Sequence, residues 1–314
     1  MYIRTTTLGT NLSMLNYIKS GESRYYELAL QASSGSKLSK PSDNPAAAKS
    51  VLNMNVQLTQ LQSYLDNMST AQSELDVLDD TLSSLTDSIE KANNFALQAA
   101  NGTYSPSDLA TLKSQIDQIT ENVVDLANTK YNGNYIFAGT STTTEPYSIV
   151  RNAAGAITSI DYNGTPSTGD YERHVTISDG TTATINTTGD KVFGSYNLGT
   201  GDNTGLLGNL VTLSNALATN DSAAISASIT NFETNSNAAL AARTKFAAVT
   251  QRFELTTNSI NTTKMQLTSY KSDLEDVDLA QVLTELSAQK TALEATMSLT
   301  AQMLNGTSLL DYIR

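Results

Sequence analysis

The chain has 314 residues and a formal net charge of −12, with 31 acidic and 19 basic residues. It contains no cysteine and one histidine, which excludes disulfides, cysteine nucleophiles and the common structural zinc sites. Binding to a phosphate backbone needs clustered Lys and Arg, so the acidic balance argues against nucleic acid as a partner. We therefore expect no enzyme chemistry, no cofactor and no metal.

The hydropathy pattern predicts neither a membrane span nor a cleavable secretory signal. No window approaches ~18 consecutive apolar residues, and the segment Met1 to Thr7 lacks a basic region followed by an apolar run. Aromatic residues make up only 6% of the chain, while Ser, Thr, Asn and Ala are abundant. This composition favours long, thin helical packing over a thick globular core.

The first strong helical signal begins after Asn44, which is a suitable N-cap residue, with Pro45 at the first helical position. If this helix ends at Asn101-Gly102, it covers about 55 residues and about 80 Å. Its apolar residues recur every three or four positions, as in a coiled coil. They are Leu61, Leu65, Met68, Ala71, Leu75, Leu78, Leu82, Leu85, Ile89, Ala92 and Ala96.

A second helix is predicted to begin at Ser105, with Pro106 at its first position and Asp108 completing a capping box. Its apolar positions are Leu109, Leu112, Ile116, Ile119, Val123 and Leu126. The connection to the first helix is short, so we expect the two helices to be antiparallel.

Between about residues 130 and 205 the pattern changes to short alternating runs. Asn132-Gly133 and Asp179-Gly180 are turn signals, and the second lies between two short β-like segments, as in a hairpin. The Gly-rich segment 199–205 fits no nucleotide-binding spacing, and we interpret it as a flexible return loop. We expect a small β-rich insertion here.

Helical periodicity returns after residue 205 and again after Asp221, and continues with Phe246, Val249, Phe253, Thr256, Ile260, Thr263, Leu267, Tyr270, Leu274 and Val277. The next apolar series, from Leu279 to Leu304, is out of phase with this one by two residues. The break falls in the acidic run Asp273 to Asp278, which lacks the glycine and spaced oxygen ligands of a calcium loop. A solvated joint between two helices is therefore favoured over a divalent-ion site.

The only histidine, His174, lies in a predicted strand. Alternation places it on the face of Glu172 and Thr176, opposite Val175 and Ile177. Without a second histidine or a nucleophile motif, we expect a solvent-facing strand residue and not a catalytic base.

Several short segments are weak signals singly and specific as an ordered set. They are Ser33-Ser34-Gly35, Lys40 to Ala47, Asn101-Gly102-Thr103, Leu126 to Thr129, Gly133 to Gly139, Ala242-Arg243 with Arg252, Glu275 to Leu279, and Ser308 to Ile313. This set resembles the flagellin-related axial proteins of the bacterial flagellum. Within that family, Pro41 to Pro45 and Tyr135 to Gly139 favour the hook–filament junction proteins over filament-forming flagellin.

The resemblance implies a structural role in the junction between hook and filament, through self-assembly of subunits with paired terminal helices. It implies a homo-oligomeric ring or tubular layer, with hook-associated protein 1, flagellin and a flagellar export chaperone as partners. It also implies an extracellular place in the flagellum, reached by type III export without a cleaved signal peptide. A flagellin filament subunit is the alternative, and a secreted coiled-coil adhesin is less favoured.

The expected architecture is mainly α, an elongated antiparallel coiled-coil rod with a small β-rich insertion domain. We expect an N-terminal assembly segment (1–45) that pairs with a C-terminal assembly helix (279–314), a helical body (46–130 and 206–278) and a β-rich outer domain (131–205). Both ends carry little apolar surface, so we expect them to become ordered only on assembly.

The predicted site residues fall into two groups. The assembly interface comprises Leu8, Leu12, Leu15, Ile18, Leu28, Leu283, Leu286, Leu293, Met297, Leu304, Leu309 and Leu310. The family motifs supply Pro41, Ser42, Asp43, Pro45, Tyr135, Phe137, Gly139, Arg243 and Arg252.

Overall fold

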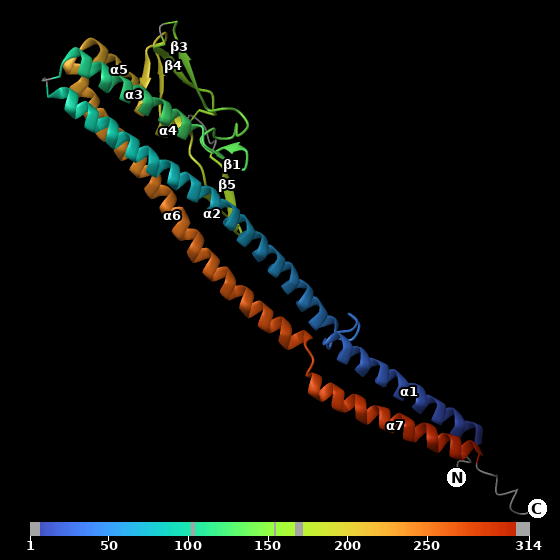
Figure 1. Ribbon diagram of the computed structural model, residues 1–314. Helices are drawn as coiled ribbons and strands as arrows, with labels where there is room; N and C mark the ends of the chain where they lie inside the picture. The colour runs from blue at the N-terminus through green and yellow to red at the C-terminus, as the bar shows by residue number, and fades with distance from the viewer. Residues whose placement is uncertain (1–6, 102–103, 154, 167–171, 306–314) are drawn as a thin grey trace, which may run out of the picture. The chain divides into compact units, whose positions relative to one another are not determined.

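The structure is a computed structural model that describes residues 7–101, 104–153, 155–166 and 172–305. It confirms the predicted fold class, since long helices precede and follow a group of small antiparallel sheets in the chain (Figure 1). The helices are α1 (Thr7–Ser34), α2 (Pro45–Ala100), α3 (Pro106–Ala127), α4 (Gly189–Val192), α5 (Gly205–Thr219), α6 (Ser222–Glu275) and α7 (Leu279–Asn305). None of the described helices has both the length and the hydropathy of a membrane span.

The chain divides into two units, each of which is described by itself. Unit 1 comprises residues 1–60 and 262–314, and unit 2 comprises residues 61–261. Helices α2 and α6 both continue from one unit into the other. The divisions therefore fall inside these helices and not at the expected boundaries after residues 45 and 278.

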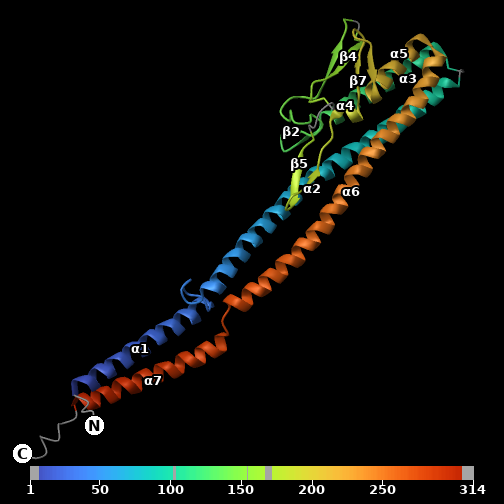
Figure 2. The same ribbon diagram turned by 180° about the vertical axis from the view of Figure 1, so that it is seen from behind.

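In unit 1, α1 and α7 lie side by side, as both views show (Figures 1 and 2). Leu28 on α1 and Val282 on α7 are buried. The side-chain amide of Gln289 donates a hydrogen bond to the backbone oxygen of Gly21 over 3.2 Å. Each helix thus covers part of the other's apolar surface. That the two ends become ordered only on assembly stays a prediction.

The joint between α6 and α7 is a capped helix break. The carboxylate of Asp278 accepts hydrogen bonds from the backbone N–H groups of Ala280 and Gln281, at 2.9 and 3.2 Å. The backbone N–H of Val277 donates to the oxygen of Gly35 in the α1–α2 connection, at 3.0 Å. The predicted phase break is confirmed, and its cause is the new N-cap at Asp278.

The core of unit 2 is built on the predicted apolar series of α2 and α3. From Met68 to Ala96 every α2 residue of that series is buried, and Leu61 and Leu65 are half-buried. Asn44 accepts from the backbone N–H of Ala47 at 3.1 Å, and Ser105 forms the capping box with Asp108. Both helix starts are confirmed. In α6 burial follows the predicted series through Phe246, Phe253 and Ile260.

Beyond Ile260 the prediction for α6 is wrong. The expected helical body (206–278) includes the series up to Leu274, but Tyr270 is 62% and Leu274 is 36% exposed. These positions lie in unit 1, and the described part of the chain covers them only in part.

The β-rich insertion forms three antiparallel sheets within the described residues, two of them simple hairpins and one with strand order β3-β4-β7-β8. The strands are β1 (Lys130–Tyr131), β2 (Asn134–Tyr135), β3 (Tyr147–Arg151), β4 (Ile157–Tyr162), β5 (His174–Ser178), β6 (Thr181–Thr184), β7 (Ser195–Asn197) and β8 (Asp202–Thr204). The predicted turns at Asn132-Gly133 and Asp179-Gly180 are confirmed. In β5 the exposed His174 and Thr176 alternate with the half-buried Val175 and the buried Ile177, as predicted.

The segment 199–205 is not a flexible loop. It closes the β7–β8 hairpin, in which Ser195 pairs with Thr204 and Asn197 with Asp202. The hairpin requires glycine at its base, because a Cβ on Gly194 would lie 2.1 Å from the backbone oxygen of Thr204.

Candidate functional site

Helices α1 and α7 of unit 1 carry an exposed apolar surface, which we name the terminal face. Leu12 and Leu15 are 54% and 56% exposed on α1, and Leu283 and Met297 are 54% and 42% exposed on α7. Tyr17, Tyr26, Leu30, Leu279 and Leu299 are exposed on the same two helices. Surface of this kind on paired helices is typical of a protein that packs against neighbours.

The other predicted interface residues lie in different environments. Ile18, Leu286 and Leu293 are half-buried. Leu28 is 2% exposed, so it stabilises the α1–α7 pair and leaves no surface for a neighbour, which corrects its assignment. Leu309 and Leu310 lie outside the described residues, and so do the side chains of Leu8 and Leu304.

The sequence did not reveal which side of α7 contacts α1. The buried or half-buried positions are Val282, Glu285, Leu286, Gln289, Leu293, Thr296 and Thr300, a mixture of apolar and polar residues. This mixed series overlaps the predicted apolar series only at Leu286, Leu293 and Thr300. The predicted residues Leu283 and Met297 consequently point away from the inner face, which is why they are exposed.

The Pro-rich motif forms the turn before α2. The carboxylate of Asp43 accepts a hydrogen bond from the backbone N–H of Lys40 at 2.8 Å. Pro41 and Ser42 are exposed in this turn, and Pro45 is the first residue of α2. The motif therefore starts a helix.

The aromatic motif Tyr135 to Gly139 anchors the β-rich insertion. Phe137 is fully buried, and its ring meets that of Phe193 edge to face with centroids 4.8 Å apart. Tyr135 lies under the Lys130 ammonium at 4.4 Å. Gly139 has a positive φ of 66°, and an added Cβ would be 3.1 Å from the Thr165 side chain.

The buried Tyr147 and the half-buried Tyr162 complete this aromatic core. Burial raises the pKa of the Tyr147 hydroxyl well above its usual value and that of Tyr162 to about 12. Both hydroxyls are therefore protonated at neutral pH. Tyr147 donates to the backbone oxygen of Gly194 and Tyr162 to that of Phe137, each at 2.9 Å.

Arginines join the β5–β6 hairpin and α6 to their neighbours. The guanidinium of Arg243 donates two hydrogen bonds to the Asp79 carboxylate of α2, at 2.9 and 3.2 Å, and its pKa rises chiefly because of them. Arg252 donates to the backbone oxygen of Thr182 at 3.4 Å. Both motif arginines thus make structural contacts within unit 2.

Three further contacts of the hairpin were not predicted. Arg173 binds the buried carboxylate of Glu74 on α2, and Glu172 accepts from Lys245 and Lys191 at 3.1 and 3.5 Å. Partial burial raises the pKa of Glu172, but the hydrogen bonds and charges of the two lysines outweigh this effect and hold it below its usual value. These partners lie up to 99 residues apart, so no local pattern could identify them.

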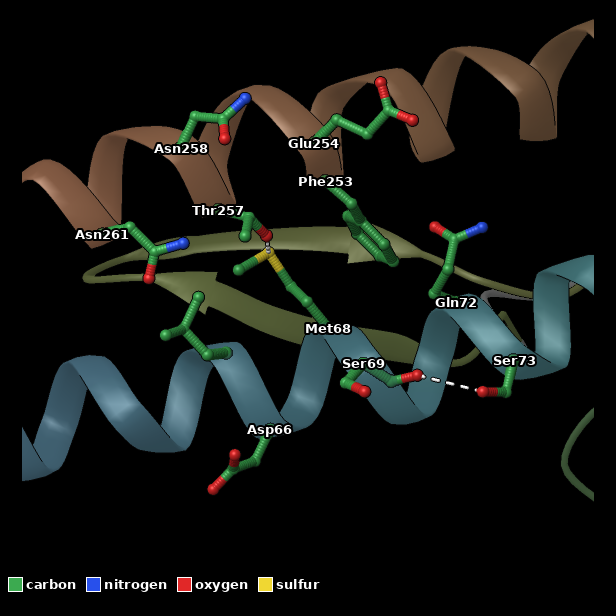
Figure 3. Close-up of a pocket in the computed structure, with 11 residues that line it drawn as sticks. Asp66, Met68, Ser69, Gln72, Ser73, Phe253, Glu254, Thr257, Asn258 and Asn261 are labelled. Atoms are coloured by element: carbon green, nitrogen blue, oxygen red, sulfur yellow. Dashed lines mark hydrogen bonds between the residues drawn. The ribbon is translucent and has the colours of Figure 1, made fainter.

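A groove of about 740 Å³ lies between α2 and α6 within unit 2 (Figure 3). The Met68 and Phe253 side chains extend toward each other and form its floor. Asp66 lies on the α2 side and Glu254 on the α6 side, while Thr257, Asn258 and Asn261 complete the wall. No group of three potential metal-binding side chains occurs among the described residues.

The molecule combines long helices from both ends of the chain, an apolar surface on the terminal helix pair and an internal β-rich insertion. These features define a helical structural protein that packs with neighbours. Residues 6–142 match the bacterial flagellin N-terminal helical region, and residues 229–313 match the bacterial flagellin C-terminal helical region. The chain belongs to the flagellin family.

Two curated relatives carry the name flagellar hook-associated protein 3. The protein of Escherichia coli (strain K12) is 32% identical over 132 residues, and that of Salmonella typhimurium is 31% identical over 131 residues. The matches cover 42% and 41% of both chains, so the chain spans about two fifths of the relatives' length.

Solved structures share the fold at lower identity. A flagellar hook-associated protein from Vibrio parahaemolyticus superposes with a TM-score of 0.63 at 20% identity, over 74% of this chain and 100% of that chain. FlgL of Xanthomonas campestris gives a TM-score of 0.57 at 15% identity, over 70% of this chain and 99% of that chain.

Proposed function

We propose that the chain is a structural axial component of the bacterial flagellum that forms the junction between hook and filament. The observation that carries this proposal is the terminal face, with Leu12, Leu15, Leu283 and Met297 between 42% and 56% exposed. Covering these side chains between copies would offset the entropy lost when subunits associate. The curated relatives named flagellar hook-associated protein 3 support the junction as the place of assembly.

In this proposal identical copies form a ring or tubular layer. The interface comprises Leu12, Leu15, Ile18, Leu283, Leu286, Leu293 and Met297, with Leu8, Leu304, Leu309 and Leu310 as further candidates from the sequence. The other partners are hook-associated protein 1 on one side, flagellin on the other and an export chaperone before assembly. The protein acts outside the cell as a structural subunit without catalysis, and export takes place without a cleaved signal.

The paired substitution Leu12→Glu with Leu283→Glu tests the terminal face. Both side chains are exposed, so the variant should keep its helical circular dichroism while losing self-association in sedimentation velocity. Ser13→Glu with Ser298→Glu is the matched control, because it adds the same two charges at exposed positions of α1 and α7. If the paired variant assembled as well as the control, the terminal face would not be the interface.

Deletion of the gene tests the junction role. Cells should then keep their hooks and release unassembled flagellin, because the layer that carries the filament is missing. The alternative, a flagellin filament subunit, predicts that the purified chain grows into long filaments when seeded. Such growth, with hooks and filaments otherwise intact in the deletion strain, would contradict the junction role.

A further inference from the structure

Charge is distributed unevenly between the two units. Unit 1 contains ten basic and ten acidic residues, whereas unit 2 contains nine basic and twenty-one acidic residues. The whole net charge of −12 therefore belongs to unit 2. Two copies of unit 2 repel each other, while unit 1 and unit 2 of different copies do not, so the electrostatics favour contacts between unlike units.

The groove of Figure 3 continues along α2 and α6 into a second cavity of about 520 Å³. Leu75 and Phe246 are buried beside this second cavity, and Glu254 lines both. Together the cavities follow α2 from residue 65 to residue 79, or about 21 Å at 1.5 Å per residue. This length matches about four turns of a helix lying in the groove.

Three carboxylates along the groove, those of Asp66, Asp76 and Glu254, have no cationic partner among the described residues, whereas Asp79 pairs with Arg243, which also lines the second cavity. Asp66 accepts from the side chain of Gln62 and Asp76 from that of Gln72, both at 2.8 Å. Within the described ranges, no Lys or Arg forms an ion pair with Asp66, Asp76 or Glu254. The groove therefore has an apolar floor, with the Asp66 and Glu254 carboxylates at its outer edges, where they point away from the space between the two helices (Figure 3).

The first three turns of α2, in unit 1, have the complementary surface. Leu52 and Val56 are 63% and 67% exposed, and with Lys49 they are spaced three and four residues apart on one face of the helix. Lys40 is exposed in the turn before the helix. Neither lysine forms an ion pair in the part of the chain that the structure describes.

We infer that the groove of unit 2 binds the start of α2 from a second copy of the chain. Leu52 and Val56 cover the apolar floor, and Lys49 and Lys40 lie against the unpaired carboxylates. This contact rests on the proposed self-assembly and adds a second interface to the terminal face. It is a helix-in-groove contact whose charged edges make it sensitive to salt.

Site-directed disulfide cross-linking tests this contact, because the chain has no cysteine of its own. A chain with Val56→Cys is mixed with a differently tagged chain with Asn258→Cys, which lines the groove. The two should form a mixed disulfide under mild oxidation. Leu255→Cys is the matched control, since Leu255 is an exposed residue of α6 that does not line the groove.

Charge reversal tests the chemistry of the contact. Lys40→Glu with Lys49→Glu on the Val56→Cys chain should lower the cross-link yield by about tenfold. The reason is that two attractive pairs between exposed charges become two repulsive ones. Asp66→Lys with Glu254→Lys on the Asn258→Cys chain should restore it. The yield for the unmodified pair should also fall as the salt concentration rises.

The outcomes of these experiments test the groove contact separately from the proposed function. Equal yields for Asn258→Cys and Leu255→Cys, or no effect of charge reversal, would overturn the groove contact. Normal assembly without this cross-link would do the same and leave the proposed function standing. A specific, charge-dependent cross-link in a chain that never assembles further would retain the groove contact and contradict the proposed function. Protection of the Asn258→Cys thiol by another flagellar protein, but not by a second copy, would overturn the inference.

Discussion

Arg173 places its two terminal nitrogens on the two carboxylate oxygens of Glu74, at 2.8 and 2.6 Å, and thereby joins the β5–β6 hairpin to helix α2. The Glu74 side chain is 6% exposed and that of Arg173 is 33% exposed. A carboxylate this deeply buried depends on its partner, whereas the arginine can still reach water.

Arg173→Met should therefore destabilise unit 2 by about 2–3 kcal/mol, less than for a fully buried pair because the arginine is partly solvated. Urea unfolding followed by circular dichroism measures the change. The matched control is Arg151→Met, since Arg151 pairs with Glu121 at 2.5 Å on the surface and should cost at most about 1 kcal/mol. If both variants lost the same free energy of unfolding, the burial of Glu74 would not increase the contribution of its ion pair to stability.

Acidification should loosen the hairpin through Glu172. Lys245 and Lys191 hold its pKa below the usual glutamate value in the folded chain. A lowered folded pKa stabilises the fold above the unfolded pKa, and this contribution disappears as the pH falls through the folded value. The protection factors of the β5–β6 amides, obtained by correcting the exchange rates for their intrinsic pH dependence, should accordingly fall at acidic pH.

The variant Glu172→Gln provides the control for this pH effect. It removes the titrating group while keeping the shape of the side chain, so the acid-dependent part of the exchange should shrink. If the variant and the original chain showed the same pH dependence, other carboxylates would be responsible.

The helices of unit 2 could be predicted because their signals are local. The α2 series from Met68 to Ala96 repeats at helical spacing, and the caps at Asn44 and Ser105 lie next to the helices that they start. The inner face of α7 could not be predicted in this way, since Gln289 and Thr296 take part in it beside Val282. There the partner helix, and not the apolar pattern, selects the buried side.

The candidate sites show the same limit. The exposed leucines at 12, 15 and 283 were identifiable as apolar residues of marginal helices, but only the structure shows that Leu28 is used internally. The groove and the hairpin contacts depend on α2 and α6 residues far apart in the chain, such as Gln72 and Thr250 at 3.4 Å. Long-range pairs of this kind leave no periodic signal in one sequence.

Asn235 is a polar residue in the buried apolar series of α6. It is 9% exposed, and its side-chain nitrogen finds no hydrogen-bond partner in the described part of the chain. Asn235→Leu should raise the free energy of unfolding by about 1 kcal/mol, because it removes an unsatisfied polar group. The neighbouring Asn237→Leu, at an exposed position, should change it little. A loss of stability in the first variant would show that Asn235 fixes the register of the helices.

The β7–β8 hairpin requires glycine at position 194 for two separate reasons. The residue has a positive φ of 70°, and a Cβ at this position would lie 2.1 Å from the backbone oxygen of Thr204. Gly194→Ala should cost more than about 2 kcal/mol, since strained backbone and a backbone clash add together. Gly201 separates these effects, because it has a φ of 75° but no atom within 4 Å of an added Cβ. Gly201→Ala should cost only about 1 kcal/mol. Thermal unfolding of both variants measures the difference, and equal losses would mean that the hairpin opens to relieve the clash.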